Sequence, residues 1–150
     1  MSPTPQEQAT IAALAASEKL GQDISVFDVS QQLPFADYFV IVSADNERQI
    51  SSIVDEVEDK MREAGVKPVN REGVRDTRWA LVDFGDIIVH IMRESEREFY
   101  NLDGLWGDCP RLEVEGIEST VRPEDAVNIR TVSSIDQIPL ATPSPDEDEL

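Results

Sequence analysis

Two aspartates around a glycine are the first residues whose types and spacing suggest chemistry. Asp83 and Asp86 lie three positions apart, with Gly85 between them. Carboxylates placed in this way could hold a magnesium ion, which enzymes that transfer phosphoryl or nucleotidyl groups require. Aspartate is also a favoured turn residue, and turn geometry alone accounts for the pair. A magnesium-dependent transferase that uses Asp83 and Asp86 is therefore the alternative function, not the first.

Other catalytic signatures are missing from the chain. His90, the single histidine, could act as a general base, but its apolar neighbours favour a histidine held on a strand by a hydrogen bond. Cys109, the single cysteine, has no clear base beside it in the sequence. The glycine-rich phosphate-binding patterns and the G-x-S-x-G pattern do not occur. We therefore expect no catalytic residue, no metal ligand and no cofactor.

The net charge limits the possible partners. The chain has 31 acidic and 13 basic residues, which gives a formal charge of −18 over 150 residues. Such a chain repels nucleic-acid backbones and anionic membranes, because both bind proteins through lysine and arginine. It attracts basic proteins over long range. No apolar run is long enough to cross a membrane and no signal peptide is visible, so we expect a cytoplasmic protein.

Helices and strands must position these residues, and the hydrophobic periodicity predicts where they lie. Residues 6–20 form a helix on which Ile11 and Leu14, with Ala15 as a further candidate, share the face expected to meet the core. Residues 46–64 form a second helix with one apolar stripe, capped by Ser43 or Asp45. Residues 24–29 alternate as a strand, and the apolar run 38–42 is typical of a strand covered on both faces. Residues 79–83 and 87–92 form a hairpin, and an S-x-x-E capping box at 95–98 opens a last helix.

These elements predict an α/β fold: a single domain with a mixed β-sheet flanked by helices. The domain covers residues 6–110, after a frayed start over residues 1–5. Residues 111–150 carry ten acidic and three basic residues and no aromatic residue. With little to bury, this acidic tail is predicted to be disordered.

Aromatic residues gather in the hairpin and the last helix. Phe99 is the first choice for the core. Beside it, one short helix must accommodate Tyr100, Leu102, Leu105 and Trp106. Tryptophan and tyrosine are favoured at interface hot spots. An exposed binding patch and a fully buried cluster are therefore equally good interpretations of this group.

The same segments resemble the ribosomal silencing factor family, also called the Iojap-like family. The resemblance spans about residues 8–109 and keeps its order and spacing throughout. It is carried by Asp37-Tyr38-Phe39-Val40-Ile41-Val42-Ser43-Ala44, Asn46-x-Arg48-Gln49, Glu72-Gly73, Trp79-x-Leu81-x-Asp83-x-Gly85-Asp86-x-x-Val89-His90-Ile91-Met92 and Arg97-x-Phe99-Tyr100-x-Leu102-x-x-Leu105-Trp106.

The resemblance implies a fold similar to that of nucleotidyltransferases, without their catalytic elements. It also implies a translational repressor that binds the large ribosomal subunit through ribosomal protein L-fourteen and blocks joining of the small subunit under nutrient limitation. Some members are thought to be homodimers when free. From motif position and side-chain chemistry we predict that the partner contacts Trp79, Asp83, Asp86, Tyr100, Leu102, Leu105 and Trp106.

Overall fold

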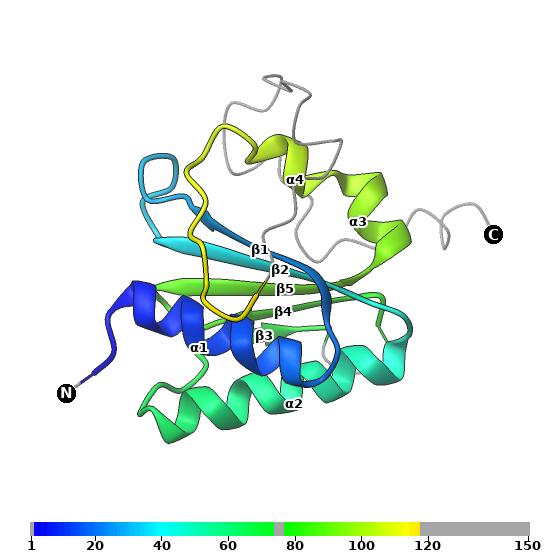
Figure 1. Cartoon of the computed structure of the whole chain (residues 1–150), viewed down its shortest axis with the longest axis horizontal. Coiled ribbons are helices and arrows are strands. Elements are labelled where there is room, and N and C mark those ends of the chain that lie inside the picture. Colours follow the sequence, from blue (N-terminus) through cyan, green and yellow to red (C-terminus); the bar gives the residue numbers. More distant parts are fainter. Residues whose placement is uncertain (1, 74–76, 118–150) are drawn as a thin grey trace.

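The computed structural model describes residues 2–73 and 77–117 (Figure 1). The elements are α1 (Pro5–Glu18), β1 (Gln22–Asp28), β2 (Tyr38–Ala44), α2 (Glu47–Glu63), β3 (Asn70–Glu72), β4 (Trp79–Asp83), β5 (Ile87–Arg93), α3 (Glu94–Tyr100) and α4 (Leu102–Leu105). Within these residues no helix is long and apolar enough to cross a membrane. Most of the predicted tail lies outside the described residues.

The strands form one five-stranded mixed sheet in the order β1-β2-β5-β4-β3. Strands β2 and β5 are parallel, and the other neighbours are antiparallel. The parallel pair needs a crossover, which α2 and the β3–β4 hairpin provide. The predicted α/β domain with a mixed sheet and flanking helices is confirmed, whereas β3 was not predicted.

Helices cover both faces of the sheet, with α1 and α2 on one side and α3 and α4 on the other (Figure 1). The side chains of β2 therefore alternate between two cores. Val40 and Val42 pack in the core between the sheet and helices α1 and α2. Phe39 and Ile41 pack in the core between the sheet and helices α3 and α4. A strand buried on both faces reads as a continuous apolar run, so the prediction for residues 38–42 is confirmed.

Helix α1 turns a different face to the sheet from the one predicted. Its buried residues include five alanines, Ala9, Ala12, Ala13, Ala15 and Ala16. Leu14 is 37% exposed, so the prediction that it faces the core is wrong, whereas Ile11 is partly buried and packs against the core. Alanine lets the helix lie close to both the sheet and α2, and Leu14 points outward.

Helix α2 has the apolar stripe that its sequence predicted. Ile50, Ile53 and Val57 are fully buried. The cap is Asn46, whose side chain accepts a hydrogen bond from the Gln49 backbone, and not Ser43 or Asp45 as predicted. Because an N-cap residue sits immediately before the first helical turn, only Asn46 is placed to reach that amide.

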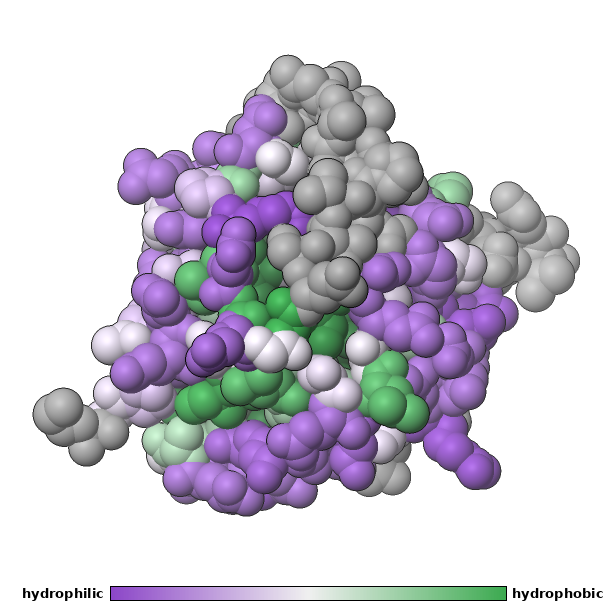
Figure 2. Space-filling model, viewed as in Figure 1, coloured by the Kyte–Doolittle hydropathy of each residue, from purple (hydrophilic) through white to green (hydrophobic). Residues whose placement is uncertain are grey.

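The chain packs beyond the predicted domain end at residue 110. The Pro110 carbonyl accepts a hydrogen bond from the amide of Asp28, and the Leu112 amide donates to the carbonyl of Val26. Val114 is buried, and Ile117 packs against the core under α1 and α2. Figure 2 shows apolar surface between the two helical layers on this side of the molecule, bordered by hydrophilic residues. Residues 110–117 therefore belong to the folded unit.

Candidate functional site

The β4–β5 hairpin buries the single histidine beside a tryptophan. Residues 79 and 81 of β4 point toward the α3–α4 layer, as does His90 of β5, which pairs with Leu81. Trp79 Nε1 donates a hydrogen bond to His90 Nδ1 over 3.1 Å, and both side chains are buried. Desolvation in this site lowers the pKa of His90 to about 3. The imidazole is therefore neutral, and the predicted hydrogen bond from a neighbour to this strand histidine is confirmed.

A row of aromatic rings leads from this buried pair to the surface. The rings of Trp79 and Tyr100 lie 4.9 Å apart between centroids, and those of Tyr100 and Phe99 lie 5.1 Å apart. Phe99 is 62% exposed, so the prediction that it belongs to the core is wrong. We call Phe99, Tyr100 and the Trp79 ring behind them the aromatic face. It presents one large exposed side chain on a layer of packed rings.

Phe99 is exposed because α3 turns its charged side to the protein. The buried residues of this seven-residue helix are Glu96 and Arg97. Arg97 and Phe99 differ by two positions, or about 200° around a helix, so when one points inward the other points outward. The helix begins after Arg93 without a side-chain cap, and the predicted capping box of Ser95 and Glu98 is wrong. The chain already becomes helical at Glu94, directly after β5.

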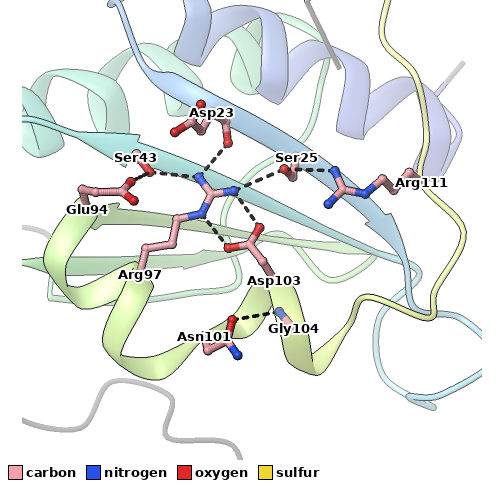
Figure 3. Close-up of polar contacts among 9 residues, drawn as sticks. All are labelled: Asp23, Ser25, Ser43, Glu94, Arg97, Asn101, Asp103, Gly104 and Arg111. Atoms are coloured by element: carbon pink, nitrogen blue, oxygen red, sulfur yellow. Dashed lines mark hydrogen bonds and ion pairs between the residues drawn. The ribbon is translucent and has the colours of Figure 1, made fainter. Parts of the chain in front are cut away.

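Arg97 lies at the centre of a buried polar network (Figure 3). Its Nε and Nη2 atoms donate to both carboxylate oxygens of Asp103 in α4, over 2.7 and 2.8 Å. Its Nη1 atom donates to the backbone carbonyl of Asp23 over 2.6 Å and to Ser43 Oγ over 2.9 Å. Its Nη2 atom also donates to Ser25 Oγ over 3.2 Å. All five guanidinium N–H groups are therefore used, on α4, β1 and β2.

The connection between α3 and α4 depends on the residue types at Asn101 and Gly104. Asn101 has a left-handed backbone (φ 52°), and its side chain accepts a hydrogen bond from the Gly104 amide over 3.1 Å. A Cβ atom at Gly104 would lie 2.4 Å from Asn101 Nδ2, so only glycine fits without a shift. Asn101 separates the two helices, and Asp103 of α4 contacts Arg97 of α3.

The structure buries most of the predicted contact residues. Exposed fractions are 6% for Trp79, 0% for Leu102 and 7% for both Leu105 and Trp106. These four pack in the core under α3 and α4, and Tyr100 is partly buried against them. Of these five residues, Tyr100 alone is partly exposed, and the other four lie buried in the core.

Asp83 and Asp86 lie at the opposite end of the hairpin from Trp79. Asp83 is paired with Ile88, and Trp79 with Met92, so the two ends of β4 are about 13 Å apart. Asp83 Oδ1 accepts a hydrogen bond from the Gly85 amide, which is turn chemistry. Asp86 is exposed and accepts a hydrogen bond from Gln8 of α1.

No metal-binding cluster supports the alternative function. In residues 2–73 and 77–117, no group of three or more histidine, cysteine, aspartate or glutamate side chains could hold a metal ion. Cys109 is buried and forms no disulfide. The sequence prediction missed the outward position of Phe99 and the inward position of Arg97. Both stand in the quoted family motif, but nothing in a single sequence says which of them faces the core.

Comparison with known proteins gives a consistent result. The family model described as "Ribosomal silencing factor during starvation" matches residues 2–137. The Bacillus subtilis ribosomal silencing factor is 38% identical over 105 residues, which cover 70% of this chain and 89% of the relative. The chloroplastic Iojap protein of Zea mays is 36% identical over 105 residues, which cover 68% of this chain and 44% of that protein.

Solved structures agree with the fold. A crystal structure from Chromobacterium violaceum superposes with a TM-score of 0.68 at 31% identity, over 78% of this chain and 98% of that one. A crystal structure from Bacillus halodurans gives a TM-score of 0.64 at 30% identity, over 73% of this chain and 99% of that one. The chain therefore belongs to the ribosomal silencing factor family.

Proposed function

We propose that this protein represses translation by docking on the large ribosomal subunit through ribosomal protein L-fourteen. Once docked, it blocks joining of the small subunit by its bulk, without catalysis. Membership of the silencing factor family is the observation that carries this proposal. A protein with this function works in the cytoplasm, where subunits join.

Charge and shape support a protein partner. The formal charge of −18 favours encounter with basic ribosomal proteins and disfavours direct binding to ribosomal RNA. The exposed Phe99 ring, with Tyr100 beside it, offers the aromatic anchor that interface hot spots favour. We propose the aromatic face as the centre of the docking surface and Asp83 as an acidic contact at its rim.

The buried members of the predicted contact set have a supporting role in this proposal. Leu102, Leu105 and Trp106 fill the core behind the aromatic face, so replacing them would act through packing. Asp86 lies on the α1 side of the hairpin turn, where Gln8 holds it. It contributes long-range charge to the partner and not direct contact.

Sedimentation of the full-length protein with isolated large subunits tests the proposal. We expect co-migration, and large subunits carrying the protein should fail to join added small subunits. Phe99→Ser should weaken binding by more than about ten-fold, because a central aromatic anchor is removed from an otherwise unchanged fold. Leu20→Ser is the matched control, because Leu20 is 76% exposed and lies at the α1–β1 turn, near the α1–α2 layer.

Each outcome has a defined meaning. Absence of large-subunit binding at micromolar concentration would contradict the proposed function. Binding without any block of subunit joining would contradict the steric mechanism. If Phe99→Ser and Leu20→Ser weakened the affinity for large subunits equally, this would contradict the aromatic face as the docking surface.

We also propose that free protein self-associates and that the ribosome competes with this association. Light scattering over a dilution series, with and without ribosomal protein L-fourteen, tests this point. A constant monomer mass at every concentration would contradict it.

A further inference from the structure

We infer that Arg97 and Asp103 form a positioning device for the aromatic face. The buried pair holds α3 at a fixed orientation, so that Phe99 and Tyr100 meet a protein partner in one geometry. This inference rests on the proposed function, because it concerns how the same docking surface is held.

Apart from the Tyr100 ring, which packs on Trp79, helix α3 places no apolar side chain in the core. It has seven residues, far fewer than an isolated helix needs for stability in water. Its buried side chains are Glu96 and Arg97, so its inner side is charged and its outer side carries Phe99. This is the reverse of the arrangement by which helices usually dock on a core. The orientation of α3 therefore depends on directional polar contacts.

The Arg97 network supplies those contacts from three different directions. Asp103 fixes α3 against α4, Ser43 fixes it against β2, and Asp23 and Ser25 fix it against β1. Bidentate and fully satisfied guanidinium contacts restrict rotation about the helix axis as well as translation. An apolar contact of the same size would allow both to vary.

The two serines of the Arg97 network also make hydrogen bonds to other charged residues. Ser43 Oγ donates to Glu94 at the start of α3 over 2.8 Å, so the serine that accepts from Arg97 also holds the first turn. Ser25 Oγ also accepts from Arg111 over 3.3 Å (Figure 3). The Arg111 guanidinium lies 4.6 Å from the centre of the Phe27 ring. The network thereby joins both ends of the α3–α4 pair to β1 and β2.

A buried ion pair of this kind fits an orienting role better than a stabilising one. Desolvation of the two charges offsets most of their attraction, and apolar residues of similar volume often stabilise a fold equally well. Removing only one charge leaves the other buried and unpaired, which is strongly destabilising. Replacing both together separates orientation from stability.

The test compares two double variants of the full-length protein. Arg97→Met/Asp103→Leu replaces the buried pair with apolar side chains. Arg62→Met/Asp59→Leu is the matched control, because that ion pair of α2 has side chains 55% and 59% exposed. We expect both variants to fold, with an unchanged urea midpoint for the control and a lower one for the first variant, because the Asp23 carbonyl and two serine hydroxyls lose a donor. Only the first should bind large subunits more weakly, by about ten-fold or more.

A folded Arg97→Met/Asp103→Leu variant that binds with wild-type affinity would overturn the inference. If this variant does not fold, Ser25→Ala/Ser43→Ala decides, because it removes two acceptors of Arg97 and keeps the ion pair. We expect a several-fold weaker affinity for the folded form of this second variant, together with a lower free energy of unfolding, because two N–H groups of the buried Arg97 lose their acceptors. An unchanged affinity would overturn the inference.

Hydrogen exchange separates this inference from the proposed function. In Arg97→Met/Asp103→Leu, or in Ser25→Ala/Ser43→Ala, the amides of α3 should exchange faster while those of β5 stay protected. This readout does not involve the ribosome. If the wild-type protein does not bind large subunits, the proposed function is refuted. The positioning role is tested separately: it is refuted if the amides of α3 exchange as slowly in these variants as in the wild-type protein.

Discussion

Acidification should destabilise the protein through His90, and the size of the effect follows from its burial. The pKa of this imidazole is lowered from 6.5 to about 3 by desolvation in the core. Between these values the unfolded chain binds a proton that the folded chain does not bind. The free energy of unfolding therefore decreases as the pH falls, by about 1.4 kcal/mol per pH unit in this range.

The stabilising contribution is complete above the unfolded pKa and is lost progressively below it. Between about pH 7.5 and pH 5.0, His90 alone should account for about 2 kcal/mol. Staying above pH 5 keeps the protein away from its isoelectric point near 4.2. Many carboxylates also begin to titrate in this range, so the His90 contribution must be isolated by a variant.

His90→Gln is that variant, because the glutamine carbonyl can still accept a hydrogen bond from Trp79 Nε1 and does not titrate. Urea unfolding of both proteins at several pH values gives two stability curves. Carboxylates contribute equally to both curves, so they cancel when the free energy of unfolding of the variant is subtracted from that of the wild type. This difference should decrease by about 2 kcal/mol between about pH 7.5 and pH 5. Parallel curves would refute the reasoning, since they would mean that His90 binds a proton equally well in both states.

NMR provides an independent check, because the chain has only one histidine. The imidazole signals should not titrate above about pH 4 in the folded protein. The hydrogen bond from Trp79 to Nδ1 also requires the proton to be on Nε2, and nitrogen chemical shifts distinguish this tautomer.

Further predictions concern the α3–α4 joint, the first helix and the thiol. Gly104→Ala should lower the free energy of unfolding by about 1–3 kcal/mol, because its Cβ meets Asn101, and Asn101→Gly should partly restore it in the double variant. No rescue in a chemical unfolding series would contradict the clash. Thr4→Ala removes the capping box with Glu7 and should lower the free energy of unfolding by about 1 kcal/mol in the same assay, whereas an exposed control substitution should leave it unchanged. Cys109 should react with a thiol reagent only after urea unfolding, and rapid reaction of the folded protein would contradict its burial.

Much of the sheet could be predicted because its information is local. The apolar run of β2, the alternation of β1 and the turn at Gly85 each depend on residues within one element. The apolar stripe of α2 is strong because most charged residues lie on the opposite side; the exception is Glu58, which is buried and forms an ion pair with Arg71. For such elements, burial and periodicity carry the same information.

Elements with weak or inverted patterns could not be predicted in the same way. Helix α1 has alanine on its inner side and Leu14 outside, so hydrophobicity pointed to the wrong face. Strand β3 has three exposed residues and exists only because β4 pairs with it. The packing of residues 110–117 depends on β1, which lies more than 80 positions earlier in the chain.

The same distinction applies to the candidate site. The sequence by itself determined the family, the strong negative charge, the missing catalytic motifs and the cluster of aromatic residues around Trp79 and Trp106. The tertiary structure alone decided that Phe99 faces outward and Arg97 inward. Arg97 finds its partners at Asp23 and Ser25, more than 70 positions away in the chain, and no local pattern encodes such a pairing. A charged side chain can be buried only where distant groups satisfy all of its hydrogen bonds, and the fold brings those groups together.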